Sequence, residues 1–142
     1  MFTPQQRSTL AAAIDRIIPA DDFPSASQAG GMRFIERLFR TDLAPRLDEM
    51  RTLLDGIHAA ARTAHGSGLE SLPADAQDAL LRQVERSPLG RAFAWLVEIV
   101  NEGYYADPAN GGNDGAASWR MIGYEPRVPG YHPESIQPEG GR

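Results

Sequence analysis

Residues 89–102 are apolar around most of a helical circumference, and this segment limits the possible folds more than any other. Trp95 and Ile99 extend one wide apolar face sideways; that face consists of Leu89, Phe93, Leu96, Val97, Val100 and Tyr104. The charged strip is narrow, because its three members lie close together at 100° per residue: Arg91, Glu98 and Glu102. A helix that is apolar on most of its surface has to be surrounded by other elements. We therefore expect residues 89–102 to form the central helix of the fold.

Helical start and stop signals divide the first forty residues. Thr3 precedes Pro4, and Gln6 occupies the capping-box position, so a helix is predicted to begin here and to end before Pro19. A second helix is predicted over residues 25–39, where Ser25 can act as the N-cap. Its expected buried side chains are Met32, Ile35, Leu38 and Phe39. Two adjacent glycines early in this segment weaken a helix but permit close backbone contact.

The third predicted helix is the longest and carries one continuous apolar stripe. It runs over residues 43–65, with the stripe formed by Leu43, Leu47, Met50, Leu54, Ile57 and Ala61. Such a stripe packs inside a bundle more often than it pairs in a coiled coil, although pairing with a second chain remains an alternative. A fourth helix follows Pro73. No segment alternates with a period of two, so the sequence predicts an all-α, compact bundle of about five helices.

Composition sets the broad class. With 142 residues and a hydrophobic fraction of 42%, the chain is long and apolar enough for one folded domain. The net charge of −5 disfavours nucleic acid as a partner, because phosphate binding needs a basic face. Cysteine is absent, which excludes disulfides, thiolate metal sites and thiol catalysis. The charge-free run 92–97 is far shorter than the ~20 residues needed to span a bilayer.

An aromatic, glycine-rich and asparagine-rich segment follows the central helix. Residues 101–124 hold more specialised chemistry than a surface turn needs, and we predict that they either cap the core or face a partner. A short helix is expected to close the segment. Together with Trp95, the candidate interface residues here are Tyr104, Tyr105, Asn110, Gly111, Gly112, Asn113, Trp119, Arg120 and Tyr124. Arg120 is predicted to hold the loop closed by bridging to Asp107 or Asp114. For Trp95 itself, packing at the edge of the core is the favoured prediction.

The composition changes again at residue 124. Four prolines and three glycines are distributed over residues 124–142, so neither a helix nor a central strand is expected. We predict a helical domain at residues 1–123, followed by an extended tail that wraps a partner subunit. Tyr131 is the candidate contact residue in that tail.

A search for catalytic groups finds only weak candidates. Asp21 and Asp22 are adjacent carboxylates after a proline, where turn formation is the commoner role. His58 and His65 share a helical face but are about 10 Å apart along it, too far for one metal ion. A loop beginning at Asp107 lacks the ligand pattern of a calcium site. A free-standing metal-dependent enzyme and a self-assembling structural protein nevertheless remain open as functions.

Two blocks of the sequence resemble a known family. The first comprises residues 2–4 and 15–22, followed by 29–30 and 34–35. The second is the more specific and reads Glu102-Gly103-Tyr104-Tyr105-Ala106-Asp107-Pro108, then Gly111-Gly112-Asn113, then Trp119-Arg120-Met121-Ile122-Gly123-Tyr124. Residues 72–73 and 77–81 add a weaker match. Taken together, residues 2–124 resemble the gluconate 2-dehydrogenase subunit 3 family, the small subunit of flavin-dependent sugar dehydrogenases.

The resemblance implies an accessory function. Similar proteins accompany a large catalytic subunit of the glucose-methanol-choline type, which holds FAD and oxidises a sugar or sugar acid, and a c-type cytochrome often accepts the electrons. The small subunit is expected to bind no cofactor itself and to support folding, cofactor loading and export of its partner. Many relatives begin with a twin-arginine signal. None is present here, so we expect a cytoplasmic location, or a periplasmic one if such a signal was removed.

Overall fold

The structure is a computed structural model that describes residues 1–123, apart from the side chain of Asn110. Within that range the α-helices, in chain order, are α1 (Pro4–Ile17), α2 (Gly31–Arg40), α3 (Leu47–His65), α4 (Ala74–Glu85), α5 (Gly90–Tyr104) and α6 (Ala117–Ile122). Four single 3₁₀ turns connect them: η1 (Ala44–Arg46), η2 (Leu69–Ser71), η3 (Pro108–Asn110) and η4 (Asp114–Ala116). The predicted all-α fold class is confirmed. The predicted tail, with Tyr124, Tyr131 and His132, lies outside the described residues.

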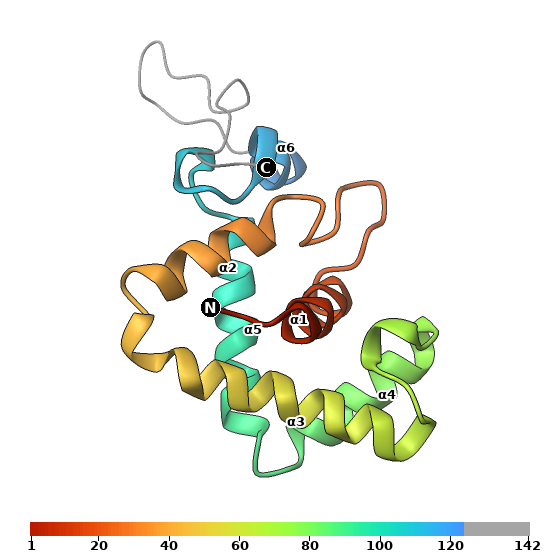
Figure 1. Ribbon diagram of the computed structural model, residues 1–142. Helices are drawn as coiled ribbons and strands as arrows, with labels where there is room; N and C mark the ends of the chain where they lie inside the picture. The colour runs from red at the N-terminus through yellow and green to blue at the C-terminus, as the bar shows by residue number, and fades with distance from the viewer. Residues whose placement is uncertain (124–142) are drawn as a thin grey trace.

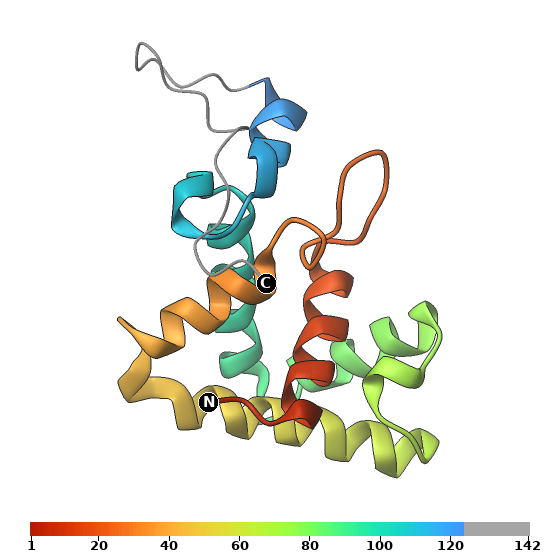
Figure 2. The same cartoon turned by 45° about the horizontal axis from the view of Figure 1, so that its top comes forward.

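Helix α5 is central, as the sequence predicts. It packs against α1, α2, α3 and α4, and α3 crosses one end of the other helices (Figures 1 and 2). The loop after α5 and helix α6 lie at the opposite end of the molecule from α3. Side chains from five helices meet in one core, whose largest fully buried members include Leu10, Ile14, Ile35, Phe39, Leu54, Ile57 and Leu96.

The local signals at α1 and α3 act as expected. Thr3 and Gln6 form the predicted capping box, with each side chain accepting a hydrogen bond from the other residue's backbone N–H. The apolar stripe of α3 is buried inside the chain's own bundle, where Leu54 and Ile57 are fully covered. Gly66 ends the helix at φ 76°, a left-handed conformation that suits glycine. The stripe is therefore core and is not presented to a second chain.

Two predicted helix starts are wrong. Helix α2 begins at Gly31 and not at Ser25, because Gly30 has φ 88° and interrupts the helical path. Ser25 and Gln28 do exchange reciprocal hydrogen bonds, at 2.9 and 3.3 Å, but these close a turn and not a helix. The third helix begins at Leu47, and the 3₁₀ turn η1 replaces the expected first turn. Proline disfavours the α conformation in the residue before it. Pro45 therefore disfavours an α-helical conformation at Ala44, the first residue of η1.

The buried face of α2 also differs from the prediction. Ile35 and Phe39 are buried as expected, whereas Met32 and Leu38 are only half-buried. Phe34, which the sequence analysis did not select, is 8% exposed and packs toward the loop after α5. The buried face of α2 is rotated because the helix has two neighbours, α5 and the loop that follows it. The predicted face allowed for only one neighbour.

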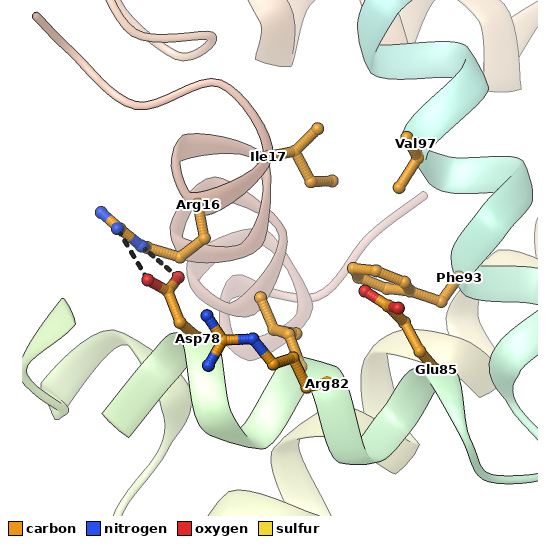
Figure 3. A pocket seen from close by; sticks show the side chains of 8 residues that line it. Arg16, Ile17, Asp78, Arg82, Glu85, Phe93 and Val97 are labelled. Atoms are coloured by element: carbon orange, nitrogen blue, oxygen red, sulfur yellow. Dashed lines mark hydrogen bonds and ion pairs between the residues drawn. The ribbon is translucent and has the colours of Figure 1, made fainter. Parts of the chain in front are cut away.

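An ion pair joins α1 to α4 and predicts a pH-dependent stability. Arg16 donates to both carboxylate oxygens of Asp78, at 2.8 and 3.1 Å (Figure 3). These hydrogen bonds hold the pKa of the Asp78 carboxyl below its usual value. Because the folded-state pKa is lowered, the stabilisation is present above the pKa of an unfolded aspartate, about 4, and is lost as the pH falls through the folded value. We expect Asp78→Asn to lower the free energy of unfolding by about 1 kcal/mol or less at pH 7.

Urea unfolding of the wild type, Asp78→Asn, Arg16→Gln and the double variant, at neutral and acidic pH, measures this coupling. The difference between wild type and Asp78→Asn should shrink on acidification. A difference that stays constant across that range would contradict the assignment.

Candidate partner interface

The segment after α5, residues 105–123, is called the cap segment here, and Asn113 organises it. The Asn113 side chain is 1% exposed. Its Nδ2 donates to the carbonyl of Ala106 at 2.7 Å, and its Oδ1 accepts from the Ser118 N–H at 2.9 Å and from the Ser118 hydroxyl at 2.7 Å. One side chain thereby ties the start of the cap segment to helix α6.

The backbone of the cap segment adopts several left-handed conformations. Gly111 and Gly115 have φ 92° and 62°, which cost glycine nothing. Asn113 and Ala116 also have positive φ, at 52° and 56°. Asparagine tolerates this region better than most residues, whereas alanine pays roughly 1 kcal/mol. Such conformations persist only where the surrounding contacts enforce them.

Contacts with α2 and the turn before it fix the cap segment to the bundle. The Asp114 N–H donates to the Ala29 carbonyl at 2.9 Å, and the Asp114 carboxylate pairs with Arg33 of α2. The predicted bridge from Arg120 to Asp107 or Asp114 is wrong, because no ion pair among residues 1–123 includes Arg120 and Asp114 pairs with Arg33 instead. Arg120 is exposed and lies in α6, while Arg33 is in the first turn of α2 and faces the loop.

Glycines let the cap segment approach the body closely. A Cβ added to Gly103 would lie 2.5 Å from the ring of Phe34, and one added to Gly112 would lie 2.6 Å from the Gly103 carbonyl oxygen. Both distances are shorter than real Cβ contacts. The chain therefore needs glycine at these two positions to bring α5, Phe34 and the loop together.

Tyr104 and Tyr105 are adjacent but have different roles. Tyr104 is 4% exposed and donates its phenolic O–H to the Pro24 carbonyl at 2.7 Å. Burial raises the pKa of the Tyr104 phenol, so the donor form is retained. Tyr105 packs edge-on against Tyr104, with ring centroids 5.3 Å apart, yet is 42% exposed. Tyr104 braces the fold and Tyr105 faces outward.

The outward side of the cap segment is aromatic and apolar. The indole N–H of Trp119 donates to the Tyr105 carbonyl at 3.0 Å, which places the half-buried indole beside that tyrosine. Ile122 is 60% exposed, the highest value among the large hydrophobic side chains of residues 1–123. Of the predicted interface residues, Gly111, Gly112 and Asn113 are buried within the loop. Tyr105 and Arg120 are on its surface.

Trp95 lies on the bundle, not on the cap segment. Its ring packs edge-on against Phe39, with centroids 5.7 Å apart, and the guanidinium carbon of Arg46 is 3.7 Å from the centre of the indole ring. The side chain is half-buried. The favoured prediction, an aromatic at the edge of the core, is confirmed.

The described residues hold no recognisable centre for metal chemistry. No group of three or more potential ligands from His, Cys, Asp and Glu is found among residues 1–123. Asp21 accepts a hydrogen bond from the Phe23 N–H at 2.8 Å, as a turn-forming aspartate does. In the same range, every helix is too short or too polar to cross a membrane.

Sequence reasoning missed three residues that build this site. Arg33 pairs with an aspartate 81 positions away, and Phe34 packs against two glycines that follow in α5 and the cap segment. Ser118 completes the network around Asn113. The paired glycines at the start of α2 were the available signal for a close approach, but they did not identify the segment that approaches.

A family model described as "Gluconate 2-dehydrogenase subunit 3" matches residues 4–126, which include the bundle and the cap segment. The chain belongs to the gluconate 2-dehydrogenase subunit 3 family. Comparisons with curated proteins and with solved structures find no match. The resemblance noted in the sequence is confirmed, and this subunit 3 protein is an accessory subunit of a dehydrogenase complex.

Proposed function

We propose that this subunit 3 protein is the non-catalytic small subunit of a sugar dehydrogenase, bound to a large FAD-containing subunit of the glucose-methanol-choline type. It supports the folding and maturation of that subunit, which oxidises a sugar or sugar acid. A c-type cytochrome is a further candidate member of the complex. The match of residues 4–126 to the subunit 3 family is the observation that carries this proposal.

The geometry of the cap segment supports a docking role. Tyr, Trp and Arg are enriched where protein surfaces bind one another, and the cap segment has an exposed Tyr105 with the Trp119 indole beside it and an exposed Arg120. Hydrogen bonds through Asn113 hold the cap segment in one conformation before binding. Little conformational entropy then has to be lost on association.

Co-expression with the large subunit tests the proposal. Affinity purification of the tagged small subunit should bring down a larger yellow protein with a flavin absorbance spectrum. The large subunit expressed alone should be less soluble or should hold less flavin. Sugar oxidation by the isolated small subunit, or its recovery without any flavoprotein, would contradict the proposal.

Exposed side chains of the cap segment provide a sharper prediction. Ile122→Glu places a charge on the outward side at a position that is 60% exposed, so folding should be unaffected. Recovery of the flavoprotein should fall about tenfold, which corresponds to ~1.4 kcal/mol of binding free energy. Arg120→Ala should weaken recovery in the same direction.

Arg62→Ala is the matched control for Arg120→Ala, because Arg62 is an exposed arginine on α3 at the other end of the molecule. Equal recovery with the control and the two cap variants would remove the cap segment from the interface.

A further inference from the structure

A groove lies between α4 and α5, beside the C-terminal end of α1 (Figure 3). Two depressions form it, with volumes of about 310 and 510 Å³, and they share Glu85, Phe93 and Val97. Apolar side chains of three helices make up its floor: Ile17, Leu81, Phe93 and Val97. This surface is called the α4–α5 groove below.

Small residues at the start of α5 create the groove. A Cβ on Gly90 would lie 2.2 Å from the Glu85 carbonyl oxygen, so glycine lets the end of α4 approach α5 closely. Ala94, one turn further along, is exposed and fills little space. This part of α5 is only partly covered by the described residues: Phe93 is buried, Val97 is half-buried and Ala94 is exposed. The apolar surface of Val97 and Ala94 is therefore available to a partner.

Positively and negatively charged side chains lie at different places along the rim of the groove. Arg82 lies near the Arg16–Asp78 pair, whereas Glu85 points toward the Phe93 side (Figure 3). Glu98 lines the second depression. Neither glutamate belongs to an ion pair found among residues 1–123. An occupant that complements this rim has apolar side chains, a cation facing the glutamates and an anion near Arg82.

A stripe of exposed residues on α5 connects the groove to the cap segment. Ala94, Glu98, Asn101 and Tyr105 are spaced by four, three and four residues, which places them on one helical stripe. All four are exposed, and the Tyr105 N–H still bonds to the Asn101 carbonyl at 3.1 Å, so Tyr105 keeps the helical register. The stripe rises about 16 Å from Ala94 to Tyr105. One partner can therefore cover both the groove and the outward side of the cap segment.

We propose that the α4–α5 groove receives an apolar segment of the large dehydrogenase subunit, with a basic side chain of that segment against Glu85 and Glu98. This inference rests on the proposed function and extends the docking surface from the cap segment along α5 to α4.

The test is co-purification of the full-length small subunit with the large subunit. Ala94→Arg fills the groove and opposes a basic side chain, so flavoprotein recovery should fall at least about tenfold. Ala59→Arg is the matched control, an exposed alanine of α3 outside the groove, and should leave recovery unchanged. Glu98→Arg should also weaken recovery, because it reverses the charge without filling the floor.

Each outcome decides between explanations. Wild-type recovery with no effect of Ala94→Arg or Glu98→Arg overturns the groove and leaves the proposed function standing. Failure of the wild type to recover any flavoprotein overturns both. A wild-type dimer in light scattering that Ala94→Arg converts to monomer overturns the groove proposal in favour of a second copy as the occupant.

A photo-cross-linking amino acid at position 94 gives an independent measurement if the arginine variant misfolds. It should cross-link to the large subunit, and the same group at position 59 should not. Equal cross-linking from the two positions, or none from position 94, would contradict the inference.

Discussion

Replacing Asn113 with alanine should lower the free energy of unfolding of the cap segment by about 3 kcal/mol, because two buried backbone groups lose their partners. The Ala106 carbonyl and the Ser118 N–H bond to this side chain at 2.7 and 2.9 Å. Alanine also takes on the positive φ of 52° that asparagine tolerates better. If the cap segment and bundle unfold together, the melting temperature should fall by roughly 10 °C.

Two tryptophans allow the site of unfolding to be located. Trp119 reports on the cap segment and Trp95 on the bundle, so single-tryptophan variants separate local from global loss. Hydrogen exchange at the Ser118 amide should become much faster in Asn113→Ala, since this amide donates directly to the asparagine. Unchanged exchange there would contradict the central role of Asn113.

Control variants separate the causes. Asn113→Gly loses the same hydrogen bonds but accepts the backbone conformation, so it should be about 1 kcal/mol less destabilising than alanine. Asn101→Ala removes an exposed asparagine whose side-chain amide donates to the Val97 carbonyl of its own helix, at 2.9 Å. Its effect on stability should be close to zero.

The helical body was predictable because its signals are local. The stripe containing Leu54 and Ile57, the apolar circumference around Leu96 and the capping box at Thr3 depend on residues within a few turns of one another. The first residue of a helix was less predictable where a single backbone dihedral angle determines it. The Ser25 cap forms, yet Gly30 with φ 88° prevents the helix from continuing.

The candidate interface was predictable only in part, and the reason is sequence distance. The aromatic and glycine-rich composition identifies the cap segment, but the partner of Asp114 lies in α2, and Arg120 is nearer in sequence. The periodicity of the sequence cannot show which arginine, on which helix, pairs with Asp114. Nor does it show that Tyr104 is buried while Tyr105 is exposed, because that division depends on where Pro24 lies.

Gly112→Ala is expected to lower the free energy of unfolding by about as much as Asn113→Ala, for a different reason. The new Cβ would lie 2.6 Å from the Gly103 carbonyl oxygen and 3.2 Å from the Phe34 Cβ. Neither atom can rotate away, since one belongs to the backbone of α5 and the other is fixed at the root of a buried side chain. The loop must shift as a whole and strain its hydrogen bonds, so we expect about 3 kcal/mol of destabilisation. Urea unfolding followed by Trp119 fluorescence measures it.

Gly66→Ala is the informative comparison, because glycine is needed at position 66 for its backbone conformation and at position 112 for its small size. Gly66 has φ 76° and open space around its Cα, so alanine there should cost only about 1 kcal/mol, the conformational penalty alone. Gly112 is not among the residues with positive φ, so its cost is steric. An equal or smaller loss for Gly112→Ala would mean that the cap segment yields easily. A yielding cap could not present Tyr105 and Ile122 as a preformed surface, and the docking role proposed for it would lose its physical basis.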